Sequence, residues 1–260
     1  MGNWLYELFC KVFKKPHKSA TPEPEQPLQK RQYEVNRPQI ATQSRRQEDM
    51  SAEAQLAYFM DKYLYSDFPN GEAFDRIRRI SDKNEQLNGV DVEFIGKDGT
   101  RYCVDEKAQL YYLNQDLPTF AFEIIFKRDG YDTTGWLCNS SLKTDLYMLI
   151  WPFATQDTSK GITWDKFTKA DCLLIHKNKI LKMLYDRGLS VEKMQRDAEH
   201  IRRAGQIGKI PIEGLRGIYY YASNPQRYRE APINIVISKS ILKGIAQRRY
   251  IVTPENGELV

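Results

Sequence analysis

The order of apolar and polar residues from Gly89 to Glu123 predicts two strands joined by a tight turn, and then a third strand. Residues 90–95 are rich in β-branched and aromatic side chains, which strands favour. The Asp98-Gly99 pair that follows is the strongest short-range signal for a β-hairpin. We expect the returning strand, 101–109, to lie beside the third strand, 119–126.

Apolar residues at helical spacing predict an amphipathic helix at residues 1–15, which lacks the long apolar stretch and cleavage site of a secretory signal. It is also no clean myristoylation signal, because Tyr6 stands where Ser or Thr is required. This helix would anchor the chain at a membrane surface or bind a protein partner, or it would dock on its own domain. Its apolar side chains are Trp4, Leu5, Leu8, Phe9, Val12 and Phe13, and Lys11, Lys14 and Lys15 gather at its end.

Residues 16–49 are polar and rich in Pro, Glu and Gln, which predicts a disordered linker. The folded domain is then expected at 50–260, with a core at 51–151 and a C-terminal extension of helices and strands at 152–260. Its first helix is predicted to open at Ser51, a candidate N-cap.

The remaining pattern predicts an α/β or α+β fold, in which helices flank a mixed sheet built around the central hairpin. Segment 71–89 indicates a short basic helix and a polar loop, and Pro152 should end a strand that starts at Asp145. Further elements are expected as strands at 135–137 and 233–237, a strand and then a helix within 170–188, and helices at 191–205 and 238–248.

Composition sets limits on the class of protein. With 260 residues, 41% of them hydrophobic, the chain can form one large domain plus a tail. Its formal net charge of +5 is compatible with nucleic-acid binding but does not require it. The four cysteines form no CxxC pair, which excludes a zinc signature and a disulfide framework and indicates a reducing, cytoplasmic setting. No apolar run has the length of a membrane span, so any membrane association would be peripheral, through residues 1–15.

The hairpin also carries the candidate chemistry. Because side chains alternate along a strand, Asp105, Lys107 and Gln109 share one face of 101–109, and Asp91 lies on the first strand, 14 residues before Asp105. Carboxylate oxygens suit Mg²⁺ or Mn²⁺. Such a metal ion stabilises charge on a phosphate and lowers the pKa of a bound water, while a lysine orients that water or stabilises the anionic transition state. The pattern therefore favours metal-dependent cleavage of phosphodiester bonds.

This Gly-x-Asp, turn, Asp-x-Lys pattern over roughly 51–151 resembles the PD-(D/E)xK nuclease superfamily, which includes restriction endonucleases and Holliday-junction resolvases. The resemblance implies a restriction-endonuclease-like core, with Asp91 and Asp105 as metal ligands and Lys107 as the catalytic lysine. An acid on the first helix often reaches the metal site in that family, and Glu53 is the candidate here. Gln109 would assist on the same strand face.

One residue departs from the family pattern. Glu106 stands where the family usually has an apolar residue that faces the core, and a buried carboxylate without a partner is costly. Glu106 therefore has a partner, or the strand is bulged, or the register differs by one residue and Glu106 replaces Asp105 as the ligand. Glu106, Glu123 and Gln86 are kept as supporting residues of the site.

Basic residues interleaved with aromatic ones are typical of a nucleic-acid surface. The preferred function is a Mg²⁺-dependent DNA endonuclease that acts on duplex or branched DNA, with a homodimer as one arrangement. Two alternatives stay open, since Asp-x-Lys on a strand is usually a solvated face: a non-catalytic module that binds nucleic acid or a protein, and a membrane-peripheral adaptor. The candidate phosphate-binding residues are Arg76, Arg79, Arg196, Arg202, Arg203, Arg216, Arg227 and Arg229.

Overall fold

The computed structural model describes residues 46–66, 74–255 and 257–260, and its fold is a mixed α+β fold with two sheets. The predicted helix at 1–15 and most of the predicted linker lie outside the described residues. The first described helix, α2 (Arg46–Met60), begins before Ser51, so the prediction of a disordered linker is wrong for residues 46–49. Helix α2 continues as the π-helical turn η1 (Asp61–Tyr65).

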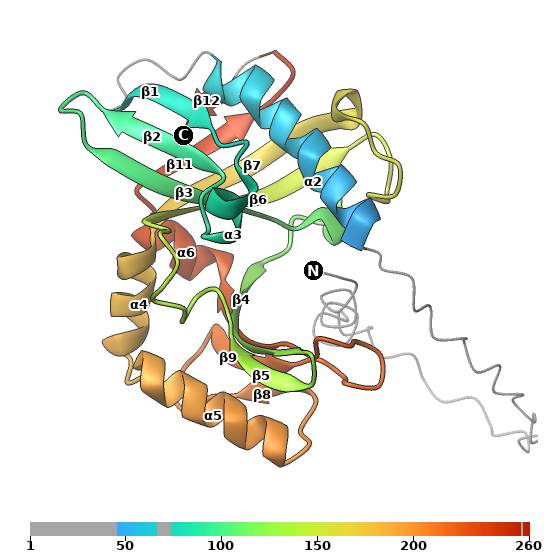
Figure 1. The fold of residues 1–260 in the computed structure, drawn as a ribbon, viewed down its shortest axis with the longest axis vertical. Coiled ribbons are helices and arrows are strands. Elements are labelled where there is room, and N and C mark those ends of the chain that lie inside the picture. The colour runs from blue at the N-terminus through green and yellow to red at the C-terminus, as the bar shows by residue number, and fades with distance from the viewer. Residues whose placement is uncertain (1–45, 67–73, 256) are drawn as a thin grey trace, which may run out of the picture.

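A seven-stranded sheet forms the upper part of the molecule in Figure 1. The hairpin of β2 and β3 is antiparallel, as its Asp-Gly turn predicts, and β3 then pairs in parallel with β6. The order of the sheet is β1 (Phe74–Arg79), β2 (Val92–Gly96), β3 (Arg101–Ala108), β6 (Leu146–Ala154), β7 (Phe167–His176), β11 (Arg248–Val252) and β12 (Gly257–Leu259).

A five-stranded sheet and three helices form the lower part of Figure 1. The order of this sheet is β5 (Tyr131–Thr134), β4 (Thr119–Arg128), β10 (Ile233–Ser238), β9 (Ile218–Ala222) and β8 (Gly208–Pro211). The helices are α4 (Lys177–Tyr185), α5 (Val191–Arg203) and α6 (Lys239–Ile245); the short helices elsewhere are α3 (Lys83–Leu87), η2 (Leu110–Tyr112) and η3 (Trp164–Lys166).

Two hydrophobic clusters lie on opposite faces of the seven-stranded sheet. On one face, α2 packs Leu56 and Phe59 against the sheet, and Figure 1 shows α2 running across it. On the other face, the sheet packs against β4, β9, β10 and the helices α4 to α6. Strands β6 and β7 are nearly continuously buried because both of their faces are covered.

Several predicted elements are corrected by pairings that are distant in sequence. Strand β4 does not lie beside β3 but belongs to the second sheet, because β3 takes β6 as its other neighbour. Segment 74–79 is not a basic helix but strand β1, which alternates in burial and covers the free edge of β2. Its pairing with β2 outweighs any local helical preference.

Further corrections concern where elements end. Pro152 lies inside β6, where pairing with β3 has already stopped at Ile150, so its missing N–H costs no bond on that side. Residues 135–137 form a turn after β5. Helix α6 ends at Ile245, and 248–252 adds strand β11. Within the described residues, no helix combines the length and apolar composition that crossing a membrane requires.

Candidate active site

The turn between α3 and β2 carries Asp91 to the hairpin. Gly89 adopts a φ of +77°, and a Cβ there would stand 2.3 Å from the Oγ1 atom of Thr144. The Thr144 hydroxyl donates to the carbonyl of Gly89 at 2.9 Å. The backbone N–H of Asp91 then donates to the carbonyl of Val104 at 2.9 Å, so Asp91 enters the hairpin in register with β3. The glycine before Asp91 is therefore required by the close approach of Thr144.

The carboxyl groups of Asp91 and Asp105 meet at this point. The side chain of Asp105 is buried, and it forms a hydrogen bond with that of Asp91. The Oδ2 atom of Asp91 also accepts from the backbone N–H of Glu106 at 2.8 Å. Burial, followed by the neighbouring charge of Asp105, raises the pKa of Asp91 to about 6. Without a cation, Asp91 is therefore the acid whose ionisation the fold disfavours.

Lys107 supplies the positive charge beside this pair. Its Nζ atom lies 2.6 Å from Oδ1 of Asp105, and its side chain is largely buried. Burial alone would lower the pKa of Lys107, but the carboxylates of Asp105 and Asp91 outweigh that effect and raise it above its usual value. The same ammonium lies 5.5 Å from the centre of the Trp136 ring. Asp91, Asp105 and Lys107 are thus brought together, and Asp105 and Lys107 share one face of β3 as the alternation along 101–109 predicts.

Glu106 lies on the opposite face of β3, where it has partners. The hydroxyl of Tyr65 donates to Oε1 of Glu106 at 2.7 Å, and the guanidinium of Arg79 forms an ion pair with the same carboxylate. Arg79 also contacts Asp61, with 2.8 Å between Nη2 and Oδ1. The partner of Glu106 is thus identified, no bulge interrupts 104–108, and Asp105 faces the site. Glu106 supports the site through its backbone N–H and not through its side chain, and the guanidinium of Arg79 is occupied by two carboxylates.

The predicted supporting residues Gln109, Gln86 and Glu53 lie around the Asp91–Asp105 pair and differ in how far they are buried. The amide nitrogen of Gln109 donates to the carbonyl of Thr119 at 2.8 Å, and this buried side chain links β3 to β4. Gln86 donates to the carbonyl of Ile80 at 2.8 Å and so fixes the loop before Asp91. Glu53 is exposed on α2, and its charge is among those that raise the pKa of Lys107. Among the described residues, we find no hydrogen bond or ion pair that joins any of these three side chains to Asp91 or Asp105.

Glu123 approaches the site from the second sheet. Burial and then the charge of Glu230 raise the pKa of Glu123 to about 7, while Lys107 opposes that shift. The backbone N–H of Trp136 donates to its carboxylate. Gly135 allows this close turn, because a Cβ there would lie 2.5 Å from the backbone of Glu123. The charges of Glu123 and Lys107 therefore interact, although the two residues belong to different sheets.

Three residues near the site were not predicted from the sequence. They are Thr144, which holds Gly89, Trp136, which lies beside Lys107, and Lys177, which opens α4. Burial lowers the pKa of Lys177, and the charge of Asp105 partly offsets that shift. The ammonium of Lys177 donates to the carbonyl of Asn139 at 2.8 Å. No local pattern marks these residues, because Thr144 and Lys177 reach the hairpin through the pairing of β3 with β6 and Trp136 reaches it from the turn after β5 in the other sheet.

The predicted phosphate-binding arginines do not form one surface. Arg76 lies on β1 and the exposed Arg196 and Arg203 lie on α5, at opposite ends of the molecule in Figure 1. Arg202 of the same helix lies 3.0 Å from Asp132 and is largely buried. The loops around β9 expose the remaining members of the set, Arg216, Arg227 and Arg229.

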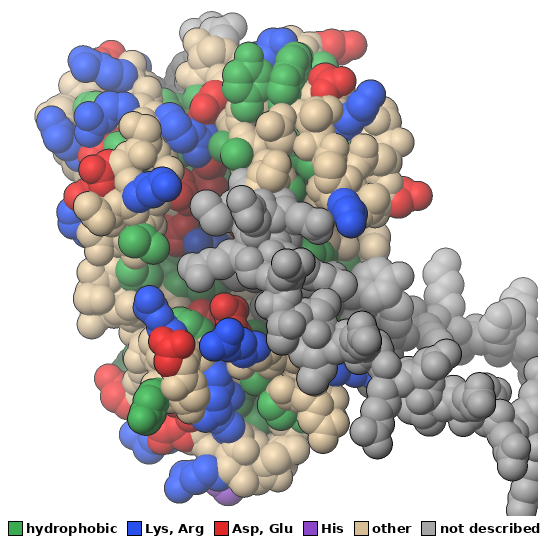
Figure 2. Space-filling model, turned by 45° about the vertical axis from the view of Figure 1, so that its right-hand side comes forward, with side chains coloured by type: hydrophobic (Ala, Val, Ile, Leu, Met, Phe, Trp, Pro, Cys, Tyr) green, Lys and Arg blue, Asp and Glu red, His purple; other side chains and the backbone are tan. Residues whose placement is uncertain are grey.

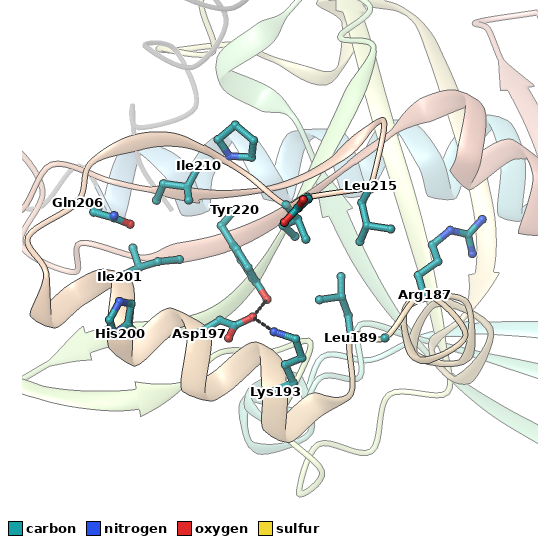
Figure 3. A pocket seen from close by; sticks show the side chains of 14 residues that line it. Arg187, Leu189, Lys193, Asp197, His200, Ile201, Gln206, Ile210, Leu215 and Tyr220 are labelled. Atoms are coloured by element: carbon teal, nitrogen blue, oxygen red, sulfur yellow. Dashed lines mark hydrogen bonds and ion pairs between the residues drawn. The ribbon is translucent and has the colours of Figure 1, made fainter.

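Figure 2 shows acidic side chains, with a basic one beside them, in the hollowed waist between the two parts of the molecule. A separate cavity of about 480 Å³ lies between α5 and strands β8 and β9, and it shares no lining residue with the acidic pair. In that cavity Asp197 accepts from Tyr220 at 2.8 Å and from Lys193 at 2.7 Å, as Figure 3 shows. Its central carboxylate is already paired, so the hairpin remains the candidate active site.

The donor atoms of the hairpin fit a Mg²⁺ site of the kind that uses few protein ligands. Mg²⁺ keeps several waters and binds through one or two carboxylates together with substrate phosphates. Asp91 and Asp105 supply two such carboxylates. The described part of the chain has no cluster of three or more His, Cys, Asp or Glu side chains that could hold a metal ion. The remaining ligands would therefore have to be water and phosphate.

Comparison of this chain with protein-family models, with curated proteins and with solved structures found no match.

Proposed function

We propose that this protein is a Mg²⁺-dependent DNA endonuclease that hydrolyses phosphodiester bonds with a metal-activated water. The observation that carries this proposal is the meeting of Asp91, Asp105 and Lys107 at one buried point of a hairpin. The orientation of Glu106 toward Arg79 and Tyr65 supports the assignment of Asp105, rather than Glu106, as the ligand. This arrangement supports the resemblance to the PD-(D/E)xK superfamily.

Each residue then has a distinct role. Asp91 and Asp105 would hold Mg²⁺ or Mn²⁺, which supplies a water of lowered pKa and neutralises charge on the phosphate. Lys107, kept cationic by its two acidic neighbours, would orient the attacking water and stabilise the charge that develops on the phosphate oxygens. Glu53 and Gln109 would assist from α2 and from the end of β3. The cysteine usage supports a cytoplasmic location.

A second candidate function is a non-catalytic module that binds nucleic acid or a protein. The observation that favours it is the internal pairing of the site: Lys107 contacts Asp105, and Asp105 contacts Asp91. Among the described residues no third acid completes a metal cluster. A centre that satisfies its own charges in this way needs no cation for folding, and it would persist in a protein that has no activity.

Cleavage of plasmid and branched DNA with Mg²⁺ or Mn²⁺ distinguishes the two candidates. We expect the wild-type protein to cleave, Asp91→Asn to lose both cleavage and calorimetric metal binding, and Lys107→Ala to lose cleavage alone. Asp98→Asn is the matched control, because Asp98 is an exposed acid in the turn of the same hairpin. If the wild-type protein neither cleaves DNA nor binds a divalent cation at millimolar concentration, the nuclease proposal fails. Salt-sensitive DNA binding without cleavage would support the module.

A further inference from the structure

The outer face of the five-stranded sheet, formed by Ala121, Tyr219, Tyr221 and Val236, is buried. Alternation along β9 and β10 turns these side chains away from the core between the two sheets. Tyr219 is 5% exposed, Tyr221 is 7% exposed and Val236 is fully buried. Two tyrosines on a sheet face reach such low exposure only when another layer covers them.

The described residues provide only part of that layer, since the ammonium of Lys209 on β8 lies 4.4 Å from the centre of the Tyr219 ring. The helices α4, α5 and α6 place their apolar side chains in the core on the opposite side of this sheet. Among the described residues, only Tyr228 of the loop between β9 and β10 packs against the outer face as an additional hydrophobic side chain. One partly buried tyrosine and one lysine side chain are too small to cover strands β4, β10 and β9 together. The cover must therefore come from another part of the chain or from another molecule.

The position of the undescribed segments restricts the choice within the chain. Segment 67–73 connects η1 to β1, both of which lie at the end of the molecule farthest from this face in Figure 1. Seven residues span at most about 25 Å when fully extended, so this connection has little reach. Residues 1–45 precede α2, and a stretch of that length imposes no such limit. Residues 16–45 are polar, which leaves 1–15 as the part with a suitable apolar stripe.

We propose that residues 1–15 dock on the outer face of the five-stranded sheet and cover Ala121, Tyr219, Tyr221 and Val236. The apolar positions 4, 5, 8, 9, 12 and 13 recur at helical spacing and would form one stripe against the tyrosines. Charge complementarity supports the same arrangement. Glu123 and Glu230 lie close enough for their charges to interact, and residues 1–15 end in three lysines.

This arrangement places the docked segment beside Glu123, the acid that interacts with Lys107 across the waist of the molecule. The inference itself does not depend on the proposed nuclease activity, because it rests on the burial of the sheet face. It also distinguishes two interpretations of 1–15 that the sequence alone leaves open, since a segment that covers its own domain is not available as a permanent membrane anchor.

Hydroxyl-radical footprinting of the full chain tests the proposal. We expect Tyr219 and Tyr221 to be protected in the wild-type protein, and their oxidation to rise several-fold in the double variant Leu8→Ser/Phe9→Ser. Glu7→Gln is the matched control, because position 7 lies off the apolar stripe, and it should keep the protection. Circular dichroism verifies that the double variant retains its fold.

A second measurement approaches the interface from the sheet. Subtracting the fluorescence spectrum of Trp4→Phe from that of the wild-type protein isolates the emission of Trp4. A docked Trp4 is buried, so we expect this emission at a short wavelength. The substitution Ala121→Arg should disrupt the interface and move the emission of Trp4 to a longer wavelength. If Tyr219 and Tyr221 stay protected in the double variant, another segment covers the sheet face and the proposal is overturned. If their protection is lost on dilution, the cover is a second copy of the chain and the proposal is overturned as well. Tyrosines that become protected only with anionic lipid vesicles would overturn it in favour of a membrane surface.

Discussion

The Nζ atom of Lys107 lies 2.6 Å from Oδ1 of Asp105, and the two side chains project from the same face of β3, two residues apart. Both are largely buried, and the carboxyl of Asp91 lies against Asp105 from the neighbouring strand. A buried charge is costly unless it is paired. The three groups therefore depend on one another, and replacing any one of them changes the charge balance of the other two.

Lys107→Met should separate catalysis from metal binding. The variant keeps the length of the side chain and removes the ammonium that lies beside Asp105 and lowers the pKa of Asp91, so Asp91 becomes harder to ionise without a cation. We expect DNA cleavage to be lost, while Mg²⁺ binding remains and becomes more dependent on pH below neutrality. Calorimetric titrations with Mg²⁺ at pH 6 and pH 8 measure this. Equal loss of metal binding at both pH values would show that Lys107 is needed to form the site.

Asp91→Asn should stabilise the metal-free protein at neutral pH. The pKa of Asp91 is raised from 3.8 to about 6, so the stability associated with its protonated form is present below pH 3.8 and is lost as the pH rises through 6. A shift of this size corresponds to roughly 3 kcal/mol at most. Asparagine avoids that loss and can still accept from the N–H of Glu106.

Thermal unfolding between pH 4 and pH 8 without metal measures the effect of Asp91→Asn. The variant should unfold at a higher temperature than the wild-type protein above pH 6 and at a similar one near pH 4. Addition of Mg²⁺ should stabilise the wild-type protein alone, because only that form offers both carboxylates. A variant that is less stable at pH 8 would contradict the raised pKa.

Glu106→Gln should lower stability without changing metal affinity. It removes the charge that Arg79 faces on the buried side of β3, and the loss of one partner of such a pair costs about 2 kcal/mol or more. Glu93→Gln is the control on the adjacent strand, because its partner Arg78 is 57% exposed and that pair should contribute less than about 1 kcal/mol. Urea unfolding and Mg²⁺ titration measure both variants. A loss of Mg²⁺ affinity in Glu106→Gln would transfer the ligand role from Asp105 to Glu106.

Gly89→Ala should disrupt the site far more than the same change in the hairpin turn. Both Gly89 and Gly99 have a positive φ, so either alanine carries the conformational cost of about 1–2 kcal/mol. At Gly99 a Cβ meets nothing within 4 Å, whereas at Gly89 it would collide with Thr144 and lie 3.7 Å from Oδ2 of Asp105. Urea unfolding should show a larger loss for Gly89→Ala, together with weaker Mg²⁺ binding. Equal losses would mean that Thr144 moves aside freely.

The hairpin and its acids could be predicted because the signals are local. The Asp98-Gly99 turn fixes the register, and alternation then places Asp105 and Lys107 on one face. The neighbours of the hairpin could not be predicted in this way. Strand β3 takes β6 and not β4, a choice that depends on how a whole second sheet covers the core. Strand propensity describes a half-buried surface and does not specify the partner strand.

The environment of Glu106 shows the same limit at the level of one side chain. The sequence indicates that a carboxylate inside a strand needs a partner, but Tyr65 is 41 residues away and Arg79 is 27 residues away. Arg79 follows a run of basic residues that is typical of a solvated or phosphate-binding face. Only the pairing of β1 with β2, beside η1, brings its guanidinium to Glu106 and Asp61. Local spacing therefore identifies the acids but not the cations that pair with them.

The arginines of α5 offer a test of the nucleic-acid surface within a single helix. Arg196 and Arg203 are exposed, whereas Arg202 pairs with Asp132 and is largely buried. If the exposed pair contacts phosphate, Arg196→Gln/Arg203→Gln should reduce the slope of log affinity against log salt by about 1.8 on duplex DNA, from 0.9 per contact. Arg202→Gln should leave the slope nearly unchanged, since its guanidinium is largely buried beside Asp132. Fluorescence anisotropy at four salt concentrations measures the slopes. An unchanged slope in the double variant would show that this helix does not contact DNA.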